Sequence, residues 1–416
     1  MNHPHEGFHN LRDVDDGLAC FLQSVRRTRV RTEWVTVPHA LARVLAGDII
    51  AQTEIPFSNR SVVDGFAVRS VDTEGATKTR PLVLKIMGES RLGEACRGIV
   101  RPGGAFAIAT GSIVPKGGDC VVPIEEATEL ADRKIALSMS VKQGENILRK
   151  GEDIARGTVV LTKGRRLRSQ DLGVLKVLGI KRVRVMMKPL VAILSTGSEL
   201  VERIQNRSSN QIVDINRLVL SAKIRQLGGN LMDLGIVKDR KELIIRALEK
   251  AVKSADMVLV SGGSSVGQRD LVPSCINALG RPGMIVHGVA MRPAMPTGLA
   301  SVRGVPIISL PGFPVSAMFA FLIFGGPMIA RLSGVEAAPE AKVQARSLKL
   351  IKGVKGYRTF VRVILSNTTN GFVATPGNSQ RASVMMSIVA ADGFVVVPEG
   401  TGEIPKGSLV EVTLLT

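Results

Sequence analysis

Aromatic side chains are scarce in this sequence, since they make up 3% of its 416 residues and include a single tryptophan and a single tyrosine. Hydrophobic residues nevertheless reach 45% of the chain. The cores must therefore be built from Val, Ile, Leu, Ala and Met. The alternation of aromatic and basic residues that is typical of single-stranded nucleic-acid binding is also missing, which disfavours that class of function.

Cysteine is rare as well, because the chain has four cysteines that lie far apart: Cys20, Cys96, Cys120 and Cys275. No two of them form a C-x-x-C pair, so neither a zinc site nor a disulfide framework is expected. This use of cysteine fits the reducing cytosol, and we expect a cytoplasmic protein.

Long apolar runs are missing too, because no segment reaches the length that a membrane-spanning helix requires. The longest candidate, residues 315–329, is interrupted by glycine and proline and is expected to be a buried helix. The N-terminal residues do not show the pattern of a signal peptide. The sequence therefore predicts no membrane association.

Charge is plentiful and unbalanced, since 55 Lys and Arg residues against 36 Asp and Glu residues give a net charge of +19. This charge favours anionic partners such as nucleic acid, phosphorylated small molecules or oxyanions. The alternative is a basic surface shared by the proteins of the host, because the basic residues are dispersed and form no tail. Nucleic acid is the least favoured partner, because no recognition motif accompanies the charge. Such binding would show a steeply salt-dependent affinity.

A chain of this length is expected to hold two to four domains. The apolar spacing from residue 15 to residue 45 predicts helices, the last of them at 39–45 after Pro38. A Ser- and Asn-rich loop then ends at Asp64 and Gly65. An Asp-Gly pair is ordinary hairpin chemistry, and the alternative is an aspartate that meets a cation or a substrate hydroxyl.

Short β-rich segments separated by Gly and Pro turns predict a small β domain after this loop. Its strands are expected at 82–87, 105–109 and 120–123. A helix follows at 169–178, with Ser169 as its N-cap. At the other end of the chain, residues 340–416 predict a β barrel or sandwich.

Strand, polar turn and helix recur between residues 182 and 333, which predicts a doubly wound α/β domain. Its strands are expected at 190–194, 231–237, 257–260 and 306–310, and its helices at 217–227 and 240–254. Ligands of such sheets bind beyond the carboxyl ends of the strands, so the polar turns should converge there. These turns begin at Ser195, Asp239, Ser261 and Pro311.

The turn after residues 257–260 is rich in glycine and serine (SGGSSVG, residues 261–267). Glycines let the backbone approach a ligand closely and turn its N–H groups outward, and serine hydroxyls add donors. The alternative is a tight connection without a ligand, because a single Gly/Ser turn is a weak signal.

Together these motifs resemble the molybdopterin molybdotransferase family, which comprises the bacterial and archaeal MoeA proteins and the E domain of gephyrin. The resemblance covers nearly the whole chain, and its motifs occur in the family's order and spacing. They are residues 61–67 (SVVDGFA), 110–119 (TGSIVPKGGD), 195–200 (STGSEL), 211–217 (QIVDINR), 261–270 (SGGSSVGQRD) and 311–316 (PGFPVS).

The resemblance implies a multidomain protein of the α/β plus β class. Its parts would be a helical linker and dimerisation domain (13–54 and 145–181), an inserted β domain (55–144), a MogA-like doubly wound α/β molybdopterin-binding domain (182–333) and a C-terminal β-barrel domain (334–416). It also implies a homodimer, in which Asp64 faces the α/β domain of the partner.

The implied activity is a transferase step of molybdenum cofactor biosynthesis. Molybdate or tungstate is inserted into adenylyl-molybdopterin, and AMP is released. Mg²⁺ is the implied cofactor, held against the pyrophosphate by carboxylates. The molybdopterin adenylyltransferase and apo-molybdoenzymes are implied partners besides the second subunit.

The resemblance also assigns residues to this chemistry. The implied catalytic residues are Asp64, Glu199, Asp239 and Asp270, and the metal ligands among them are Asp239 and Asp270. The implied substrate-binding residues are Ser61, Thr110, Asp214, Asn216, Ser261, Gly262, Gly263, Ser264, Ser265, Gly267, Arg292, Pro311, Gly312, Ser316 and Arg362. For four of these residues a structural role is the alternative: Asp239 as an N-cap, Asp214 with Asn216 as a turn and cap, and Arg362 as a solvated strand residue.

The chain departs from the family pattern at what would be its oxyanion and pterin end. Met295 stands where the family has a second lysine, Phe313 replaces an asparagine, Ser198 replaces an aspartate, and Ala382 falls where a Gly-Ser-Gly turn is expected. The departures predict either a different oxyanion, such as tungstate, or a paralog with weakened catalysis. The alternative function is therefore a non-catalytic protein that binds pterin cofactor or acts as a scaffold.

Overall fold

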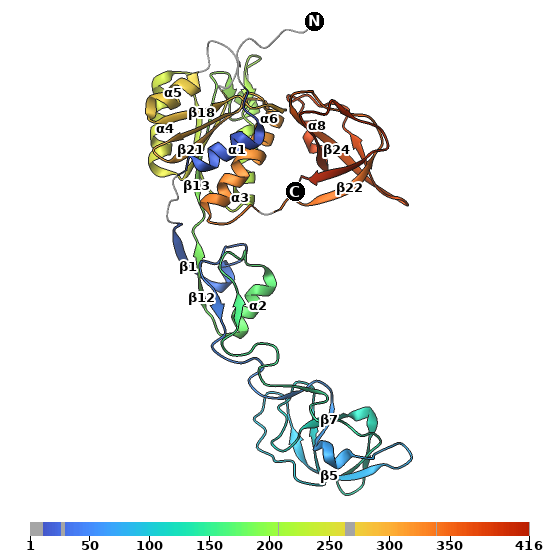
Figure 1. The fold of residues 1–416 in the computed structure, drawn as a ribbon. Coiled ribbons are helices and arrows are strands. Elements are labelled where there is room, and N and C mark those ends of the chain that lie inside the picture. The colour runs from blue at the N-terminus through green and yellow to red at the C-terminus, as the bar shows by residue number, and fades with distance from the viewer. Residues whose placement is uncertain (1–10, 26–29, 207, 263–270, 338, 416) are drawn as a thin grey trace. The chain divides into compact units, whose positions relative to one another are not determined.

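The computed structural model describes residues 11–25, 30–206, 208–262, 271–337 and 339–415. The chain divides into two compact units, each coloured by residue number in Figure 1. The large unit is drawn from residues 1–33, 42–44 and 185–416, and the small unit from residues 34–41 and 45–184. The chain passes between them through β1 (Thr32–Thr36) and β12 (Arg182–Met186), which form a two-stranded sheet.

The small unit is built mainly on a six-stranded sheet, with the order β7-β4-β6-β5-β9-β8. Its strands are β4 (Gly65–Val68), β5 (Leu82–Ser90), β6 (Gly104–Ile108), β7 (Cys120–Pro123), β8 (Ala127–Leu130) and β9 (Lys134–Leu137). Two short pairs accompany the sheet: β3 (Arg60–Ser61) with β10 (Ile147–Leu148), and β2 (Ile49–Ile50) with β11 (Val159–Leu161). The remaining elements are α2 (Ser169–Val177) and the 3₁₀ turns η1 (Val37–His39), η2 (Ser70–Thr73) and η3 (Ile124–Glu126). The strands predicted at 82–87, 105–109 and 120–123 are therefore confirmed.

The helix predicted at 39–45 is wrong. Residues 32–36 form β1, Pro38 lies in the turn η1, and Ala42 has a φ of 60° that no α-helix contains. β-Branched residues fill 35–37, and their stiff side chains favour the extended backbone that β12 then pairs with. The helix after Ser169 is confirmed, although its N-cap is Arg168, whose N–H donates to the Asp171 carboxylate.

The large unit holds a second six-stranded sheet, with the order β16-β13-β17-β21-β20-β18. The first four strands are parallel: β16 (Asn230–Val237), β13 (Leu190–Thr196), β17 (Met257–Ser261) and β21 (Val305–Leu310). The last two, β20 (Gly298–Val302) and β18 (Pro282–His287), add an antiparallel edge. All four parallel strands match the predicted positions.

Alternate side chains of the parallel strands pack into two separate cores. Val191 and Ile193 of β13 lie in the core under α1 (Val14–Gln23) and α3 (Asn216–Gln226), while Leu194 lies in the core under α4 (Lys241–Ser254) and α5 (Leu271–Leu279). Helices therefore cover both faces of the sheet, which confirms the doubly wound α/β fold (Figure 1).

A third apolar helix region runs through Pro314–Leu332 as α6 (Pro314–Ala320), the π-helical turn η5 (Phe321–Gly325) and α7 (Gly326–Leu332). By length and composition alone it is the one helix among the described residues that could span a membrane. Phe319, Phe321 and Phe324 are completely buried against the sheet, which confirms the buried helix predicted at 315–329.

The C-terminal part of the large unit is a closed five-stranded barrel, because β24 pairs with both β25 and β26. Its strands are β22 (Lys342–Ser347), β24 (Arg358–Thr368), β25 (Gly371–Pro376), β26 (Gly393–Val397) and β28 (Leu409–Leu414). β19 (Met291–Arg292) adds to β24, β23 (Ile351–Lys352) pairs with β27 (Glu403–Ile404), and α8 (Met386–Val389) precedes β26. The predicted barrel is thus confirmed.

Three of the scarce aromatic residues join the barrel to the α/β sheet. The ring of Phe319 in α6 lies 5.4 Å from Phe360 of β24 and 5.2 Å from Phe394 of β26. Aromatic pairs at this separation add to the free energy gained by burial, by about 0.5–1.5 kcal/mol each. They therefore help to fix β24 in place against the α/β sheet.

Candidate functional site

The polar turns of the large unit converge at one edge of its sheet, as predicted. Strand register places Ser195 opposite Ser261, and Ser261 opposite Leu310. Thr196 lies opposite Val237 at the end of β16. The four parallel strands therefore end side by side, at the edge where α/β proteins bind their ligands.

Asp239 ties two of these strand ends together. Its carboxylate Oδ2 accepts a hydrogen bond from the backbone N–H of Ser198 at 3.0 Å, and the Asp239 N–H donates to the Ser198 hydroxyl at 3.3 Å. The expected capping of α4 by Asp239 is wrong, because the N-cap is Arg240 and no side chain caps the helix. Asp239 stays exposed to solvent, at the edge where a ligand would bind.

Glu199 follows β13 and is also exposed. Its carboxylate lies back over Gly197, where an added Cβ would come within 2.8 Å of Oε1. The Glu199 carbonyl accepts the N–H of Ile212 at 2.9 Å, next to the parallel pair β14 (Leu200–Val201) and β15 (Ile212–Val213). A glycine at 197 therefore leaves this carboxylate room beside the strand end.

Asn216 links the ends of β17 and β21 through its side-chain amide. The Nδ2 group donates to the Ser261 hydroxyl at 2.9 Å and to the Gly312 carbonyl at 2.8 Å. Its Oδ1 atom is buried and has no hydrogen-bond partner among the described residues. A buried polar atom without a partner is rare, and ligands are one explanation for it.

Gly262 must be glycine at its position. Its φ is +94°, and a Cβ there would lie 2.3 Å from the Thr196 carbonyl oxygen. The glycine is thus explained by close packing against β13, whether or not a ligand follows. The rest of the predicted anion cradle, Gly263, Ser264, Ser265 and Gly267, lies outside the described residues, and so does the predicted metal ligand Asp270.

Asp214 has a structural partner. Its carboxylate accepts hydrogen bonds from the Arg217 N–H at 3.2 Å and from Arg217 Nε at 3.1 Å. Arg217 also bonds Asp233 and Glu202. The turn-and-cap alternative therefore describes Asp214 in this structure, whereas Asn216 keeps its place at the strand ends.

Arg362 of β24 is the largest fully buried side chain described, with 1% of its surface exposed. Its Nη2 reaches only two backbone carbonyls, Ser379 and Arg381, each at 3.4 Å, and its Nε and Nη1 have no partner among the described residues. Burial lowers its pKa to about 10, so the guanidinium remains charged at neutral pH. The alternative of a solvated strand residue is wrong.

The segment beside Arg362 also reaches the α/β part of the large unit. The Val315 N–H at the start of α6 donates to the Ala382 carbonyl at 3.4 Å. Pro311 and Ser316 of the same turn are buried, while Gly312 is exposed. The loop at 379–382 therefore lies between the Arg362 side chain and the end of β21.

Arg292 is placed differently from Arg362. It lies opposite Thr359 in the ladder between β19 and β24, and its guanidinium stacks over the Tyr357 ring at 4.9 Å. Side chains alternate along a strand, so Arg292 and Arg362 leave this ladder from opposite faces. Met295, at the position of the family's second lysine, is buried. The described residues do not gather these cations on one face.

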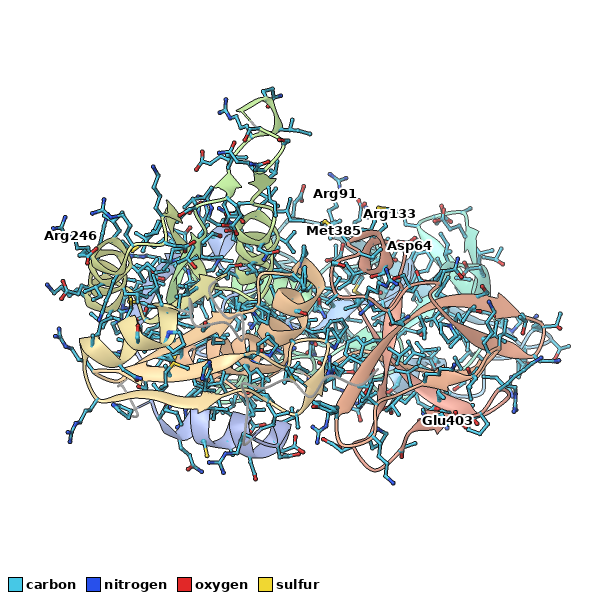
Figure 2. The ribbon with its side chains drawn as sticks, turned by 90° about the horizontal axis from the view of Figure 1, so that it is seen from above. Asp64, Arg91, Arg133, Arg246, Met385 and Glu403 are labelled. Carbon is cyan, nitrogen blue, oxygen red and sulfur yellow. The ribbon has the colours of Figure 1, made fainter. Side chains whose placement is uncertain are left out.

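In the small unit, Asp64 and Thr110 are in direct contact. The Asp64 Oδ1 atom accepts the Thr110 backbone N–H at 2.7 Å and its hydroxyl at 3.0 Å. These bonds lower the pKa of the Asp64 carboxyl, so it is a carboxylate at neutral pH. Asp64 is exposed and is labelled in Figure 2. Ser61 is buried, and its hydroxyl donates to the Val63 carbonyl at 2.5 Å, which is a structural role.

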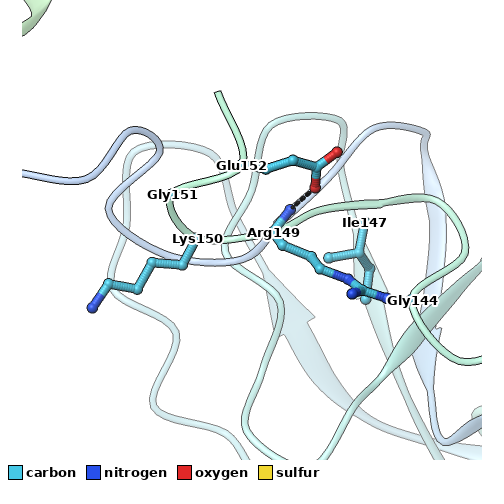
Figure 3. Close-up of a pocket in the computed structure, with 6 residues that line it drawn as sticks. All are labelled: Gly144, Ile147, Arg149, Lys150, Gly151 and Glu152. Carbon is cyan, nitrogen blue, oxygen red and sulfur yellow. Dashed lines mark hydrogen bonds between the residues drawn. The ribbon is translucent and has the colours of Figure 1, made fainter. Parts of the chain in front are cut away.

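The sequence did not predict one cleft of the small unit, of about 440 Å³. Its lining residues are Gly144, Ile147, Arg149, Lys150, Gly151 and Glu152. Figure 3 shows Arg149 running toward Gly144 while Lys150 points away, and Glu152 accepting the Arg149 N–H. The signal in the sequence is a basic pair between two glycines, both with positive φ.

The described residues contain no group of three or more His, Cys, Asp or Glu side chains arranged to hold a metal ion. Asp239 is the one expected metal ligand among them, since Asp270 lies outside. Its carboxylate already accepts the Ser198 N–H. The described part of the chain therefore does not form a Mg²⁺ site by itself.

Comparison with known proteins finds family matches for three successive parts of the chain. Residues 12–179 match the MoeA N-terminal region (domain I and II), residues 192–331 a probable molybdopterin-binding domain, and residues 344–415 the MoeA C-terminal region (domain IV). The chain is 32% identical over 410 residues to molybdopterin molybdenumtransferase 2 of Mycobacterium tuberculosis, which covers 98% of this chain and 100% of that protein. The chain belongs to the molybdopterin molybdenumtransferase family.

Further relatives agree with this family. The chain is 31% identical over 388 residues to the molybdopterin molybdenumtransferase of Bacillus subtilis, which covers 92% of this chain and 90% of that protein. The crystal structure of a molybdopterin biosynthesis MoeA protein from Pyrococcus horikoshii superimposes with a TM-score of 0.85 at 30% identity, covering 98% of this chain and all of that chain. The resemblance that the motifs indicated is therefore confirmed.

Proposed function

We propose that this member of the family is an active enzyme that inserts molybdate or tungstate into adenylyl-molybdopterin and releases AMP. Membership of a family of transferases in molybdenum cofactor biosynthesis supports the reaction class. We place the reaction in the cytosol, because none of the four cysteines, all of which lie within the described residues, forms a disulfide.

The observation that carries the proposal is the buried charge of Arg362. Burying an unpaired guanidinium costs several kcal/mol, roughly, unless an anion compensates it. No carboxylate does so among the described residues, and two of its nitrogen atoms have no partner. A planar guanidinium matches the oxygen pairs of an oxyanion or a phosphate. A bound oxyanion therefore supplies what this side chain lacks.

The other residues receive roles from their positions. Asp239 and Glu199 present exposed carboxylates at the strand ends, and Ser261 with Asn216 forms the floor between β17 and β21. We propose that this edge holds the nucleotide and pterin part of the substrate. Gly263, Ser264, Ser265 and Gly267 complete the phosphate cradle in this proposal. In this proposal Mg²⁺ would be held by Asp239 together with Asp270.

We further propose a homodimer in which Asp64 and Thr110 of one subunit serve the strand ends of the other. The support is chemical: Asp64 is an exposed carboxylate kept ionised by Thr110, yet no cation among the described residues is paired with it. A carboxylate prepared in this way suits a cation or a substrate hydroxyl brought by another surface.

The test is AMP release from adenylyl-molybdopterin after addition of molybdate or of tungstate. Native protein should release AMP with one or both oxyanions, and Asp64→Ala should reduce the rate by about 100-fold or more, as loss of a transition-state contact does. Asp132→Ala, at an exposed turn of the same unit, should keep the native rate. Native protein that binds the substrate without releasing AMP would contradict the proposal.

A scaffold protein that binds cofactor without turnover is the second candidate. The observations that favour it are the buried Met295 and the separation of Arg292 from Arg362, because both weaken the cationic site for an oxyanion. This candidate predicts substrate binding that does not depend on molybdate or tungstate. The assay above separates the two.

A further inference from the structure

Phe313 is exposed over 59% of its surface at the carboxyl end of the parallel sheet. Aromatic residues are scarce, and among the described phenylalanines only Phe57, Phe313 and Phe372 are exposed. Of the exposed three, Phe313 alone stands at the strand ends where the candidate site lies. It is also a position at which the chain departs from the family pattern.

The backbone that carries this ring is held on both sides. The Gly312 carbonyl accepts the Asn216 amide at 2.8 Å, and the Phe313 carbonyl accepts the Ala317 N–H at 2.9 Å. Pro314 then begins α6, and its ring restricts the backbone further. The phenyl ring therefore projects from a backbone segment that is already ordered. A ligand that packs against the ring would cost little further backbone entropy.

The last residues of β13 and β21, and Asn216 between β17 and β21, carry buried polar atoms without partners among the described residues. They are Oδ1 of Asn216 and the hydroxyls of Ser195, Thr196 and Ser309. Each of these residues is at least nine-tenths buried. Such atoms indicate a ligand that brings hydrogen-bonding groups to them. Asn216 bonds the Gly312 carbonyl next to Phe313, so the exposed ring indicates a ligand that also has a flat face.

We propose that Phe313 is a positioning residue on which a flat nitrogen heterocycle of the substrate stacks, while the edge groups of the heterocycle reach the polar strand ends. A fused-ring heterocycle is the ligand class that combines both features. The inference rests on the proposed function, since adenylyl-molybdopterin carries two such rings, the adenine and the pterin.

Calorimetric titration with three probes separates these two sources. AMP carries adenine and a phosphate, ribose 5-phosphate carries the phosphate without a base, and pterin 6-carboxylate carries the pterin alone. Phe313→Leu keeps an apolar side chain but removes the ring. It should weaken one of the ring-bearing probes by about 5- to 100-fold, the range known for base stacking, and leave ribose 5-phosphate unchanged. If the variant loses affinity for AMP, the ring that stacks on Phe313 is the adenine. If it loses affinity for the pterin probe, the ring is the pterin.

Two further variants guard against a purely structural effect. Phe313→Trp restores a flat ring and should recover the affinity. Phe372→Leu removes a similarly exposed ring from β25 of the barrel and should change neither probe. In turnover, Phe313→Leu should raise KM for adenylyl-molybdopterin by the same factor and leave kcat within about twofold, because stacking binds ground state and transition state alike.

The inference is overturned if Phe313→Leu binds AMP and the pterin probe as tightly as native protein. It is equally overturned if native protein binds AMP no tighter than ribose 5-phosphate and does not bind the pterin. In either case Phe313 is free to serve another surface, such as a protein partner. AMP release by native protein is measured separately, so turnover without ring-dependent binding removes this inference alone, and ring-dependent binding without turnover removes only the proposed function.

Discussion

The Asp239 carboxylate accepts the backbone N–H of Ser198, and the Ser198 hydroxyl accepts the N–H of Asp239 in return. This reciprocal pair joins the turns that follow β16 and β13. The Asp239 side chain does not cap α4 and remains exposed to solvent. Its position therefore combines a structural bond with a carboxylate that solvent and ligand can reach.

Asp239→Asn should separate these two roles. The amide oxygen can still accept the Ser198 N–H, so thermal stability should remain close to native. AMP release should fall by about 100-fold or more, because the negative charge is lost. Ser198→Ala provides the reverse case: it loses only the weak 3.3 Å bond and should keep most of the activity. A native rate in Asp239→Asn would show that the charge is not needed.

Arg362→Met should affect stability and oxyanion use in opposite directions. Replacing a buried charge by an apolar side chain of similar length is neutral or stabilising, by about 1 kcal/mol or more. The concentration of molybdate or tungstate needed for half-maximal AMP release should rise at least about tenfold, since a charge-assisted contact is lost. Urea unfolding and AMP release on the same preparation measure both effects.

Arg358→Met is the matched control on the same strand. Arg358 bonds the carboxylates of Asp15 and Glu399, which are left without their partner in the variant. This change should lower stability and leave the oxyanion dependence as in native protein. If Arg362→Met instead lowers stability as Arg358→Met does and keeps its oxyanion dependence, Arg362 has only a structural role.

Mixed dimers test whether Asp64 acts on the partner. In the proposed dimer, each site combines Asp239 of one subunit with Asp64 of the other. When the Asp64→Ala and Asp239→Ala variants are co-expressed with two different tags, the heterodimer therefore has one site that carries both changes and one fully native site. Purified heterodimer should therefore regain about half of the native AMP release, because a two-fold dimer has two equivalent sites. Either homodimer should be inactive. An inactive heterodimer would place Asp64 with the α/β sheet of its own chain.

Asp171 gives the small unit a pH-dependent stability. The Arg165 hydrogen bonds, working against burial, lower the pKa of the Asp171 carboxyl below its ordinary value. A lowered pKa in the folded state means that the contribution is fully present above the ordinary aspartate value and is lost as pH falls through the folded value. Asp171→Asn should thus cost about 1.5–3 kcal/mol at pH 7.

The measurement uses the single tryptophan, Trp34, which belongs to the same unit. Urea unfolding followed by Trp34 fluorescence should show the full difference between native protein and Asp171→Asn at pH 7, and a smaller difference at pH 3, below the ordinary aspartate pKa. Asp132→Asn, at an exposed left-handed turn position, should follow the native curve at both values. An equal difference at pH 7 and pH 3 would rule out the ionised carboxyl as its cause.

The sequence predicted best what depends on local pattern. The runs at 190–194 and 257–260 are continuous and β-branched, which is typical of strands buried on both faces, and they became β13 and β17. It failed at 39–45, where residues of good helix propensity lie beside a strand whose pairing with β12 comes from about 150 residues away. Pairing over such a separation leaves no local signal.

In the candidate site, too, the sequence predicted what depends on local pattern and missed what depends on distant contacts. The polar turns were found because each follows an apolar strand. The burial of Arg362 could not be predicted, because it depends on the loop at 377–382 folding back over β24 through Gln380, whose side chain bonds the Arg362 N–H and carbonyl. The role of Asp214 was likewise decided by Arg217 and by carboxylates distant in sequence.

One strand, β24, carries both Phe360 and Arg362 on the same face, two residues apart. The first of these side chains is fixed by the rings of α6 and β26, and the second is the buried cation. Any change that loosens the aromatic cluster will therefore shift the cation as well. Variants at Phe319 or Phe394 can accordingly imitate a substrate-binding defect although neither ring touches a ligand, and genetic screens of this protein will recover them beside true site mutations.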